Sequence, residues 1–170
     1  MRIRNIGSFC IMAVLAVPLT ATVAQERPFM IVQANEYAAL QARSSRWPWS
    51  VMKSKSLSDA RSLADIPNAD ITSRCERIHA MAAACGLAYI LDPDGRSLYV
   101  DRFESAVACG LHALRLLKGS RTEHEYNVPP AHAAFMVYLA LDILYHDLDP
   151  AKRLEIEADC DAIADGHGLS

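Results

Sequence analysis

The sequence lacks the motifs that mark common enzyme classes. It contains no glycine-rich phosphate loop, no G-x-S-x-G nucleophile turn and no G-x-G-x-x-G dinucleotide fingerprint. Positive charge is also scarce, because 17 Lys and Arg stand against 20 Asp and Glu, giving a net charge of −3. A mildly acidic chain binds nucleic acid poorly by bulk electrostatics, so we expect no nucleic-acid partner.

Metal motifs are equally scarce. The cysteines do not follow a zinc spacing, and His124 and His132 do not form an H-E-x-x-H pattern. The acidic stretch at 92–95, "DPDG", resembles the start of a calcium loop but lacks its later acidic ligands, so we expect a turn there. We therefore predict no metal and no cofactor.

The first 24 residues have the layout of a secretory signal peptide. Arg2 and Arg4 precede a short apolar run, and "TVA" places small residues before Gln25. The apolar run is too short to span a bilayer comfortably. We predict cleavage after Ala24, a periplasmic or secreted protein, no membrane partner after cleavage, and a mature domain over 25–170.

Four cysteines remain in the mature chain, and an exported protein can oxidise such residues. An even number permits disulfides, yet three of them sit among apolar neighbours on predicted helices, which is equally typical of buried free thiols. The pairing stays open at this point for Cys75, Cys85, Cys109 and Cys160.

Hydrophobic periodicity predicts an all-α protein. Apolar residues recur at three- or four-residue spacing over 72–91 and over 97–118, and 131–148 is apolar on nearly every side. We expect Asn35 to cap a first helix, a second helix at 48–63, and Ser97 to cap the helix that follows the turn. Asp149 and Pro150 form an N-cap and N1 pair for the last helix.

The stretch "LDILYHDLDPAKR" suggests a catalytic group at first sight. Asp142, Tyr145 and His146 share one helix face, and a tyrosine with a histidine can act as acid and base. His146 also lies near a helix C-terminus, where an imidazolium is favoured, and the other two side chains suit a helix boundary. We favour the structural interpretation of this trio.

Two other stretches are candidates for ligand contact. The loop "TEHEYNVPPAH" gathers polar side chains between two apolar helices, where ligand contacts commonly occur. The segment "SSRWPWS" places Trp47 and Trp49 near basic residues, a combination that binds carbohydrate rings and carboxylates. Both tryptophans can instead attach the N-terminal helices to the body, which we favour.

The order of these elements resembles the N-terminal portion of the heparinase II/III-like and alginate lyase families. The similar stretches are "RWPWSVMKSKSLSDARSLAD", "RIHAMAAACGLAYILDPDGRSLYVDRFESAVACGLHAL" and "AFMVYLALDILYHDLDPAKRLEIEADC". They cover roughly residues 28 to 165. Ile143 replaces the aromatic residue that is commoner after the aspartate in the last stretch.

The resemblance implies a partial (α/α) toroid built of antiparallel helical hairpins, in an exported polysaccharide lyase. Such enzymes cleave uronic-acid-containing polysaccharides, alginate or glycosaminoglycans, by β-elimination. Their Asn-His pair has no counterpart here, so we carry over no catalytic residue and expect those residues beyond 170, with 25–170 as a truncated N-terminal part.

The resemblance places the loop before the last hairpin at the substrate cleft. It therefore predicts Tyr126, Asn127 and His132 as contacts of an acidic polysaccharide, with Trp47 as a weaker candidate. The alternative is a complete, non-catalytic periplasmic helical module that binds a glycan or a protein. A solenoid ranks last because no repeat of fixed period occurs.

Overall fold

The computed structural model describes residues 27–28, 30–62, 71–118 and 128–165, and this part of the chain is helical without a strand. The prediction of an all-α protein is therefore confirmed. The elements, in chain order, are η1 (Ala34–Glu36), α1 (Tyr37–Ser44), α2 (Trp49–Ser62), α3 (Ile71–Leu91), η2 (Pro93–Gly95), α4 (Arg96–Arg102), η3 (Phe103–Ala108), α5 (Cys109–Lys118), α6 (Val128–Leu144) and α7 (Pro150–Asp165).

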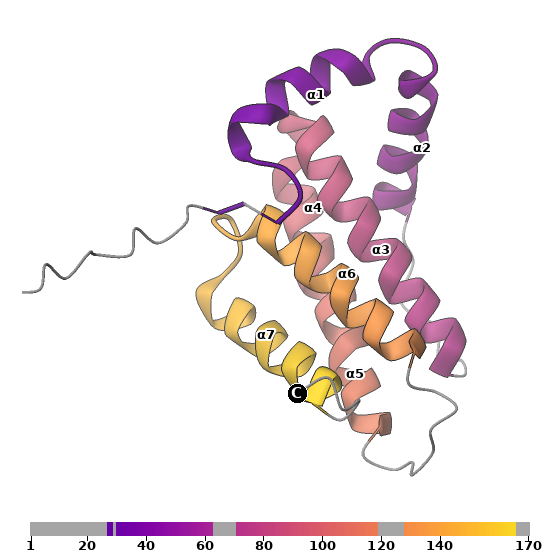
Figure 1. Cartoon of the computed structure of the whole chain (residues 1–170), viewed down its shortest axis with the longest axis vertical. Coiled ribbons are helices and arrows are strands. Elements are labelled where there is room, and N and C mark those ends of the chain that lie inside the picture. Colours follow the sequence, from indigo (N-terminus) through magenta and orange to yellow (C-terminus); the bar gives the residue numbers. More distant parts are fainter. Residues whose placement is uncertain (1–26, 29, 63–70, 119–127, 166–170) are drawn as a thin grey trace, which may run out of the picture.

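Helix α3 lies at the centre of the molecule (Figure 1). The predicted apolar stripe of this helix is confirmed, because its members Cys75, Ile78, Ala82, Cys85 and Tyr89 are buried. Helix α6 makes the most extensive contact with α3, and α2, α1, α4 and α5 also pack against it. A helix surrounded in this way must be apolar on several faces, which explains its composition.

Two successive helical hairpins form the body (Figure 1). The chain ascends through α3 and returns through α4, η3 and α5, then ascends through α6 and returns through α7. The two ascending helices pack against each other, and so do α5 and α7. Gly86 of α3 faces α6 directly, since a Cβ there would lie 3.5 Å from Ala140 Cα and 3.3 Å from Ile143 Cδ1.

The turn after α3 leads directly into the next helix. The predicted turn at 92–95 is confirmed as the short 3-10 helix η2, in which Gly95 N–H donates to Asp92 O at 3.1 Å. Helix α4 begins at Arg96, so the expected cap at Ser97 is wrong. The reason is that η2 runs on into α4 and leaves Ser97 inside its first turn.

The expected cap at Asn35 is also wrong. Asn35 lies inside the 3-10 turn η1, and α1 begins only at Tyr37. The Glu36 carboxylate accepts the Gln33 N–H at 2.8 Å, and Glu36 N–H donates to Gln33 O at 2.9 Å. A reciprocal pair of this kind satisfies the free backbone donors that a side-chain cap would otherwise bind.

Helix α6 differs from its predicted range at both ends. It begins at Val128, because the two prolines that follow occupy the first turn, where a helix needs no intrahelical N–H donor. It ends at Leu144, whose carbonyl accepts the N–H groups of Asp147 at 3.0 Å and Leu148 at 3.2 Å. The predicted second helix, 48–63, agrees closely with α2.

The N-cap of α7 is confirmed. Asp149 Oδ1 accepts the backbone N–H of Ala151 at 2.9 Å and that of Lys152 at 3.0 Å, and Pro150 is the first helical residue. Capping by an aspartate is reinforced by the favourable interaction of a negative charge with the helix N-terminus. Helices α6 and α7 are therefore joined by a short, well-defined turn.

The trio Asp142, Tyr145 and His146 forms a seam with the N-terminal segment. Asp142 is 1% exposed, accepts the Met30 N–H at 2.9 Å and lies 3.5 Å from Arg27 Nη1. The Arg27 guanidinium lies 4.3 Å from the centre of the Tyr145 ring, and His146 Nε2 lies 3.1 Å from Arg27 O. The three side chains thus attach Arg27 and Met30 to the end of α6, in agreement with the structural interpretation.

None of the four described cysteines forms a disulfide. Cys75, Cys85 and Cys160 are buried, whereas Cys109 is exposed. Burial raises the pKa of the Cys85 thiol to about 12 and also raises the pKa of Cys160, so both stay protonated. In the ranges that the structure describes, no helix combines the length and apolar character needed to cross a bilayer.

Candidate functional site

A groove of about 280 Å³ lies where α1, α2 and α3 meet. Each helix contributes one face to it, and the contributing residues are three or four positions apart. The lining residues are Leu40, Arg43 and Ser44 from α1, Trp49, Met52 and Lys53 from α2, and Leu87 and Leu91 from α3. Spacings of three and four place side chains on one side of a helix, so the groove follows from three helix faces that turn toward one point.

The tight connection between α1 and α2 positions Trp49. Helix α1 ends at Ser44, and Arg46 N–H donates to Arg43 O at 3.2 Å as the chain reverses. Ser50 N–H then donates to Arg46 O at 2.9 Å, so α2 starts at once. Trp49 is consequently the first residue of α2 and faces the side of α1 that carries Arg43.

The groove exposes a large amount of apolar side chain to water. Trp49 is 45% exposed, Met52 is 59% exposed and Leu87 is 41% exposed. Large apolar side chains that gather in a concave site are a recurrent mark of ligand contact, whereas single exposed ones need no explanation. The apolar floor of this groove therefore suits the carbon face of a ligand.

The charged residues of the groove are cations. The Arg43 guanidinium carbon lies 5.5 Å from the centre of the Trp49 ring, which is cation–π geometry. Lys53 of α2 also lines the groove, and no acidic side chain is among the lining residues. Lys53 also acts electrostatically on Asp92, although that carboxylate is bonded by Arg61 at 2.8 Å and by the Tyr99 hydroxyl at 2.6 Å. The groove thus combines aromatic and aliphatic surface with two positive charges.

Neither of the two described residues that the sequence predicts as substrate contacts, Trp47 and His132, lines this groove. Trp47 is 82% exposed on the turn before α2, so the expectation that both tryptophans attach the N-terminal helices to the body is wrong for Trp47. His132 is exposed near the start of α6, and neither residue lines the groove. Tyr126 and Asn127 lie outside the described residues.

Three of the described tyrosines, Tyr89, Tyr99 and Tyr138, donate hydrogen bonds to carboxylates. Burial, followed by the bond from its hydroxyl to Asp147 at 2.8 Å, raises the pKa of Tyr89 to about 12. Burial also raises the pKa values of Tyr138, which donates to Asp161, and of Tyr99, which donates to Asp92. A general base for neutral pH needs a lower pKa than these, so the three hydroxyls are suited to holding helices together.

Metal binding finds no support within the described ranges, where no group of three or more His, Cys, Asp or Glu side chains could hold an ion. Sequence reasoning identified the tryptophan and basic cluster of the groove but missed Leu40, Leu87 and Leu91. Their only signal was the apolar spacing of α1 and α3, which does not reveal that part of the stripe stays exposed.

Comparison with protein-family models and with curated proteins found no match for this chain.

Proposed function

We propose that this chain is an exported protein that binds acidic polysaccharide, as the N-terminal part of a polysaccharide lyase with an (α/α) toroid. The observation that carries the proposal is the groove formed by Trp49, Leu87 and the two cations Arg43 and Lys53. Its substrate is a uronic-acid-containing polysaccharide, alginate or a glycosaminoglycan. The proposal assigns the β-elimination chemistry to side chains outside the described residues.

A uronate sugar fits the two halves of the groove. Its ring carries a face of C–H groups that pack on aromatic and aliphatic side chains, here Trp49, Met52 and Leu87. Its carboxylate is planar and matches the fork of donors that an arginine guanidinium presents. Arg43 therefore binds the carboxylate, while Lys53 adds a second positive charge to the groove.

The arrangement of the helices supports the toroid. An (α/α) toroid repeats a hairpin so that ascending helices lie next to ascending helices and descending ones next to descending ones. The pairs α3 with α6 and α5 with α7 are arranged in this way (Figure 1). In this proposal, further hairpins of the same kind complete the ring around the polysaccharide.

A second candidate is a non-catalytic helical module that uses the same groove to bind an acidic glycan. What speaks for it is that the described residues supply binding groups in the groove, whereas Tyr89, Tyr99 and Tyr138 have raised pKa values and donate to carboxylates. None of the three is poised to abstract a proton at neutral pH. Binding is common to both candidates, and only the elimination reaction separates them.

The test measures binding of acidic and neutral oligosaccharides by titration calorimetry. We expect oligomers of alginate or heparin to bind and neutral cello-oligosaccharides of equal length to bind more weakly. The double variant Arg43→Gln/Lys53→Gln should lose roughly three- to tenfold in affinity for the acidic oligomers, because two partly exposed charge contacts are removed. Trp49→Ala should weaken binding of both.

The matched control is Lys55→Gln, which removes a charge from α2 outside the groove, where Lys55 pairs with Asp59 at 2.8 Å. Equal affinity for acidic and neutral oligomers, or an equal loss in the Lys55 control, contradicts the proposed site. Formation of an unsaturated uronate product, followed by ultraviolet absorbance, separates the lyase from the non-catalytic module.

A further inference from the structure

A second cavity, distinct from the groove, lies between η3, α5 and α7 and has a volume of about 530 Å³. Its floor is apolar and includes Ile156 and Ala108. One wall comes from the π-helical turn η3, a wider helical form that is frequent at functional sites. The volume is in the range of sites that hold small molecules.

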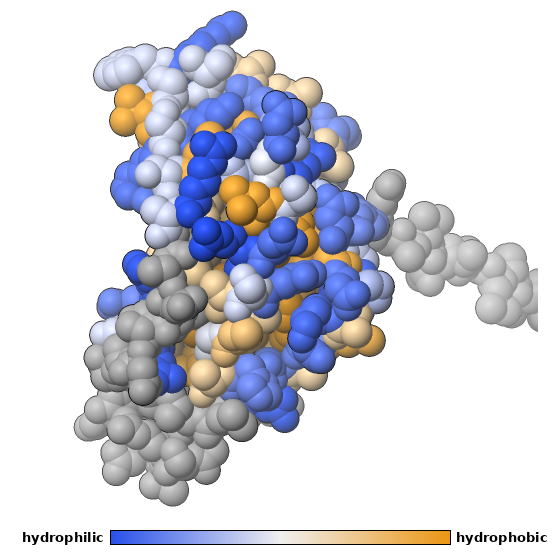
Figure 2. All heavy atoms as spheres, turned by 180° about the vertical axis from the view of Figure 1, so that it is seen from behind, coloured by the Kyte–Doolittle hydropathy of each residue, from blue (hydrophilic) through white to orange (hydrophobic). Residues whose placement is uncertain are grey.

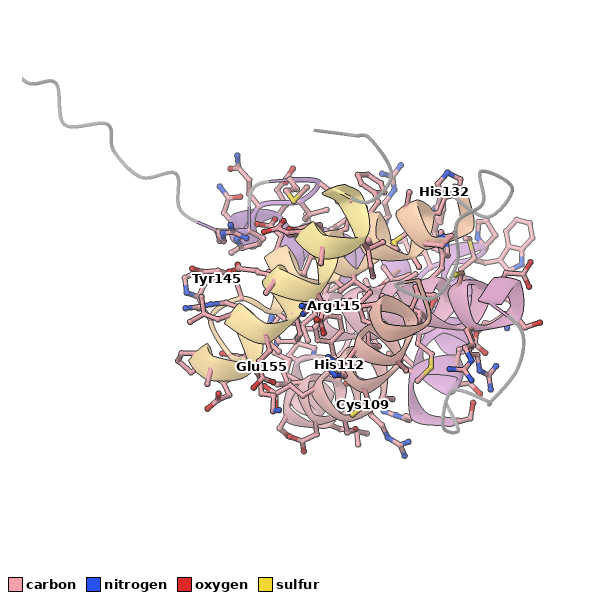
Figure 3. The ribbon with its side chains drawn as sticks, turned by 90° about the horizontal axis from the view of Figure 1, so that it is seen from below. Cys109, His112, Arg115, His132, Tyr145 and Glu155 are labelled. Carbon is pink, nitrogen blue, oxygen red and sulfur yellow. The ribbon has the colours of Figure 1, made fainter. Side chains whose placement is uncertain are left out.

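Opposite charges surround this cavity. Asp159 of α7 is 5% exposed and links the α7 side of the cavity to the α5 side. Its carboxylate accepts a hydrogen bond from Arg115 Nη1 at 2.6 Å and lies 3.2 Å from His112 Nδ1. The view from below shows Arg115 and His112 of α5 beside α7, with Glu155 nearby (Figure 3). His132 and Tyr145 lie elsewhere in the same view. The contacts of Asp159 with Arg115 and His112 hold α5 and α7 together at the inner wall of the cavity.

The outer wall carries an exposed ion pair whose two side chains can separate with little loss of stability. Lys152 Nζ lies 2.8 Å from Glu155 Oε2, and both side chains are more than half exposed. Exposed pairs of this kind contribute little to stability, so a ligand can replace each partner. A molecule that carries both an ammonium and a carboxylate group would match this pair. Hydrophilic side chains around apolar patches also characterise the back of the molecule (Figure 2).

Cys109 supplies a nucleophile at the same cavity. It lies three positions before His112 on α5, so the two side chains share a helix face, and it is the exposed thiol among the four described cysteines. Lys152 interacts with it electrostatically. Thiolates are the reactive form in disulfide exchange.

We propose that Cys109 is a site of S-thiolation by a small zwitterionic disulfide of the amino-acid type, which this cavity binds. The Cys109 thiolate attacks one sulfur of the disulfide R–S–S–R and forms Cys109–S–S–R. The released R–S⁻ accepts the proton that Cys109 gave up, so the step is an exchange without net oxidation. Lys152 binds the carboxylate of the bound half and Glu155 binds its ammonium group.

The test compares two disulfides on the full chain with its cysteines reduced. L-cystine is zwitterionic, whereas 2-hydroxyethyl disulfide is neutral, and adducts are located by mass spectrometry of peptides. We expect modification of Cys109 while the buried Cys75, Cys85 and Cys160 stay free in the folded protein. The ratio of the cystine rate to the neutral-disulfide rate should exceed that of a control thiol by roughly threefold or more.

The control thiol is Ser58→Cys in a Cys109→Ser background, because Ser58 is exposed on α2 and lies outside the cavity. The surface variant Lys152→Gln/Glu155→Gln should bring the ratio for Cys109 down to the control value. High salt should do the same in the unmodified chain, since it screens exposed charges. Equal ratios for Cys109 and the control thiol, or a ratio that salt and the double variant leave unchanged, would overturn the proposal.

Discussion

Replacing Tyr99 by phenylalanine removes one hydroxyl from the interior and leaves the ring in place. The Tyr99 ring is fully buried, and its hydroxyl donates to Asp92 Oδ2 at 2.6 Å. The same oxygen accepts Arg61 Nη2 at 2.8 Å. Gly95 packs directly against the Tyr99 ring, because a Cβ at this position would lie 2.8 Å from Tyr99 Cε2. The surroundings therefore have little freedom to rearrange around the missing oxygen.

The expected loss follows from the charge of the acceptor. A hydrogen bond to a charged group contributes about 1.5–3 kcal/mol to stability. Asp92 keeps Arg61 as a partner after the change, so we expect the lower part of that range, about 1.5–2 kcal/mol. For a protein of this length such a loss lowers the melting temperature by roughly 3–8 °C.

The same hydrogen bond makes the loss depend on pH. The bond from Tyr99 is the main reason that the pKa of Asp92 lies below its usual value, with Arg61 as a further cause. A carboxylate whose pKa is lowered by folding stabilises the protein above its unfolded pKa, and this contribution disappears as the pH falls through the folded pKa. The difference between the unmodified chain and Tyr99→Phe should therefore be largest near neutral pH and shrink in acid.

Urea unfolding followed by circular dichroism, near pH 7 and near pH 3, measures both effects. Tyr145→Phe is the matched control, because it removes a hydroxyl from a partly exposed ring at the seam. We expect Tyr99→Phe to shift the unfolding midpoint near neutral pH and the control to shift it little. An unchanged midpoint, or a shift of the same size at both pH values, would refute the reasoning about Asp92.

Two further changes test the helix boundaries and the helix contacts. Asp149→Ala should lower the free energy of unfolding by about 0.5–2 kcal/mol, because α7 loses the acceptor for two of its first N–H groups; Asp149→Asn, which keeps an acceptor, should restore most of the loss in thermal melts. Gly86→Leu should cost at least about 1–3 kcal/mol, since the side chain would enter the space held by Ala140 and Ile143. Stability equal to that of the unmodified chain in urea titrations would show that α3 and α6 are not packed this closely.

Sequence patterns within a single helix correctly predicted the features that depend only on neighbouring residues, namely the apolar stripe of α3 and the start of α7. The apolar stripe of α3 appears in the sequence because a helix that packs on several neighbours needs apolar residues at three- and four-residue spacing. Asp149 and Pro150 define a helix start because both act within one turn. Ser97 failed as a cap because the preceding 3-10 turn already aligned the chain for α4, an effect of backbone continuity that composition does not encode.

The groove and the cavity were harder to predict because they join distant residues. Trp49 and Arg43 are close in the sequence, yet that stretch favoured attachment of the tryptophans to the body over ligand contact. Leu87 joins them from another helix, through a packing arrangement that the sequence does not specify. Likewise, His112 and Asp159 are 47 positions apart, and only the pairing of α5 with α7 brings them to 3.2 Å.

The seam at Asp142 has a consequence for the order in which the protein assembles. Met30 and its acceptor Asp142 are separated by 112 positions, and Arg27 and His146 by 119. During synthesis, Arg27 and Met30 emerge long before α6 is available to bind them. Their attachment therefore cannot be completed until α6 has been synthesised. A bulky fusion placed directly before Arg27 would therefore interfere with the completion of the fold more than with its initiation.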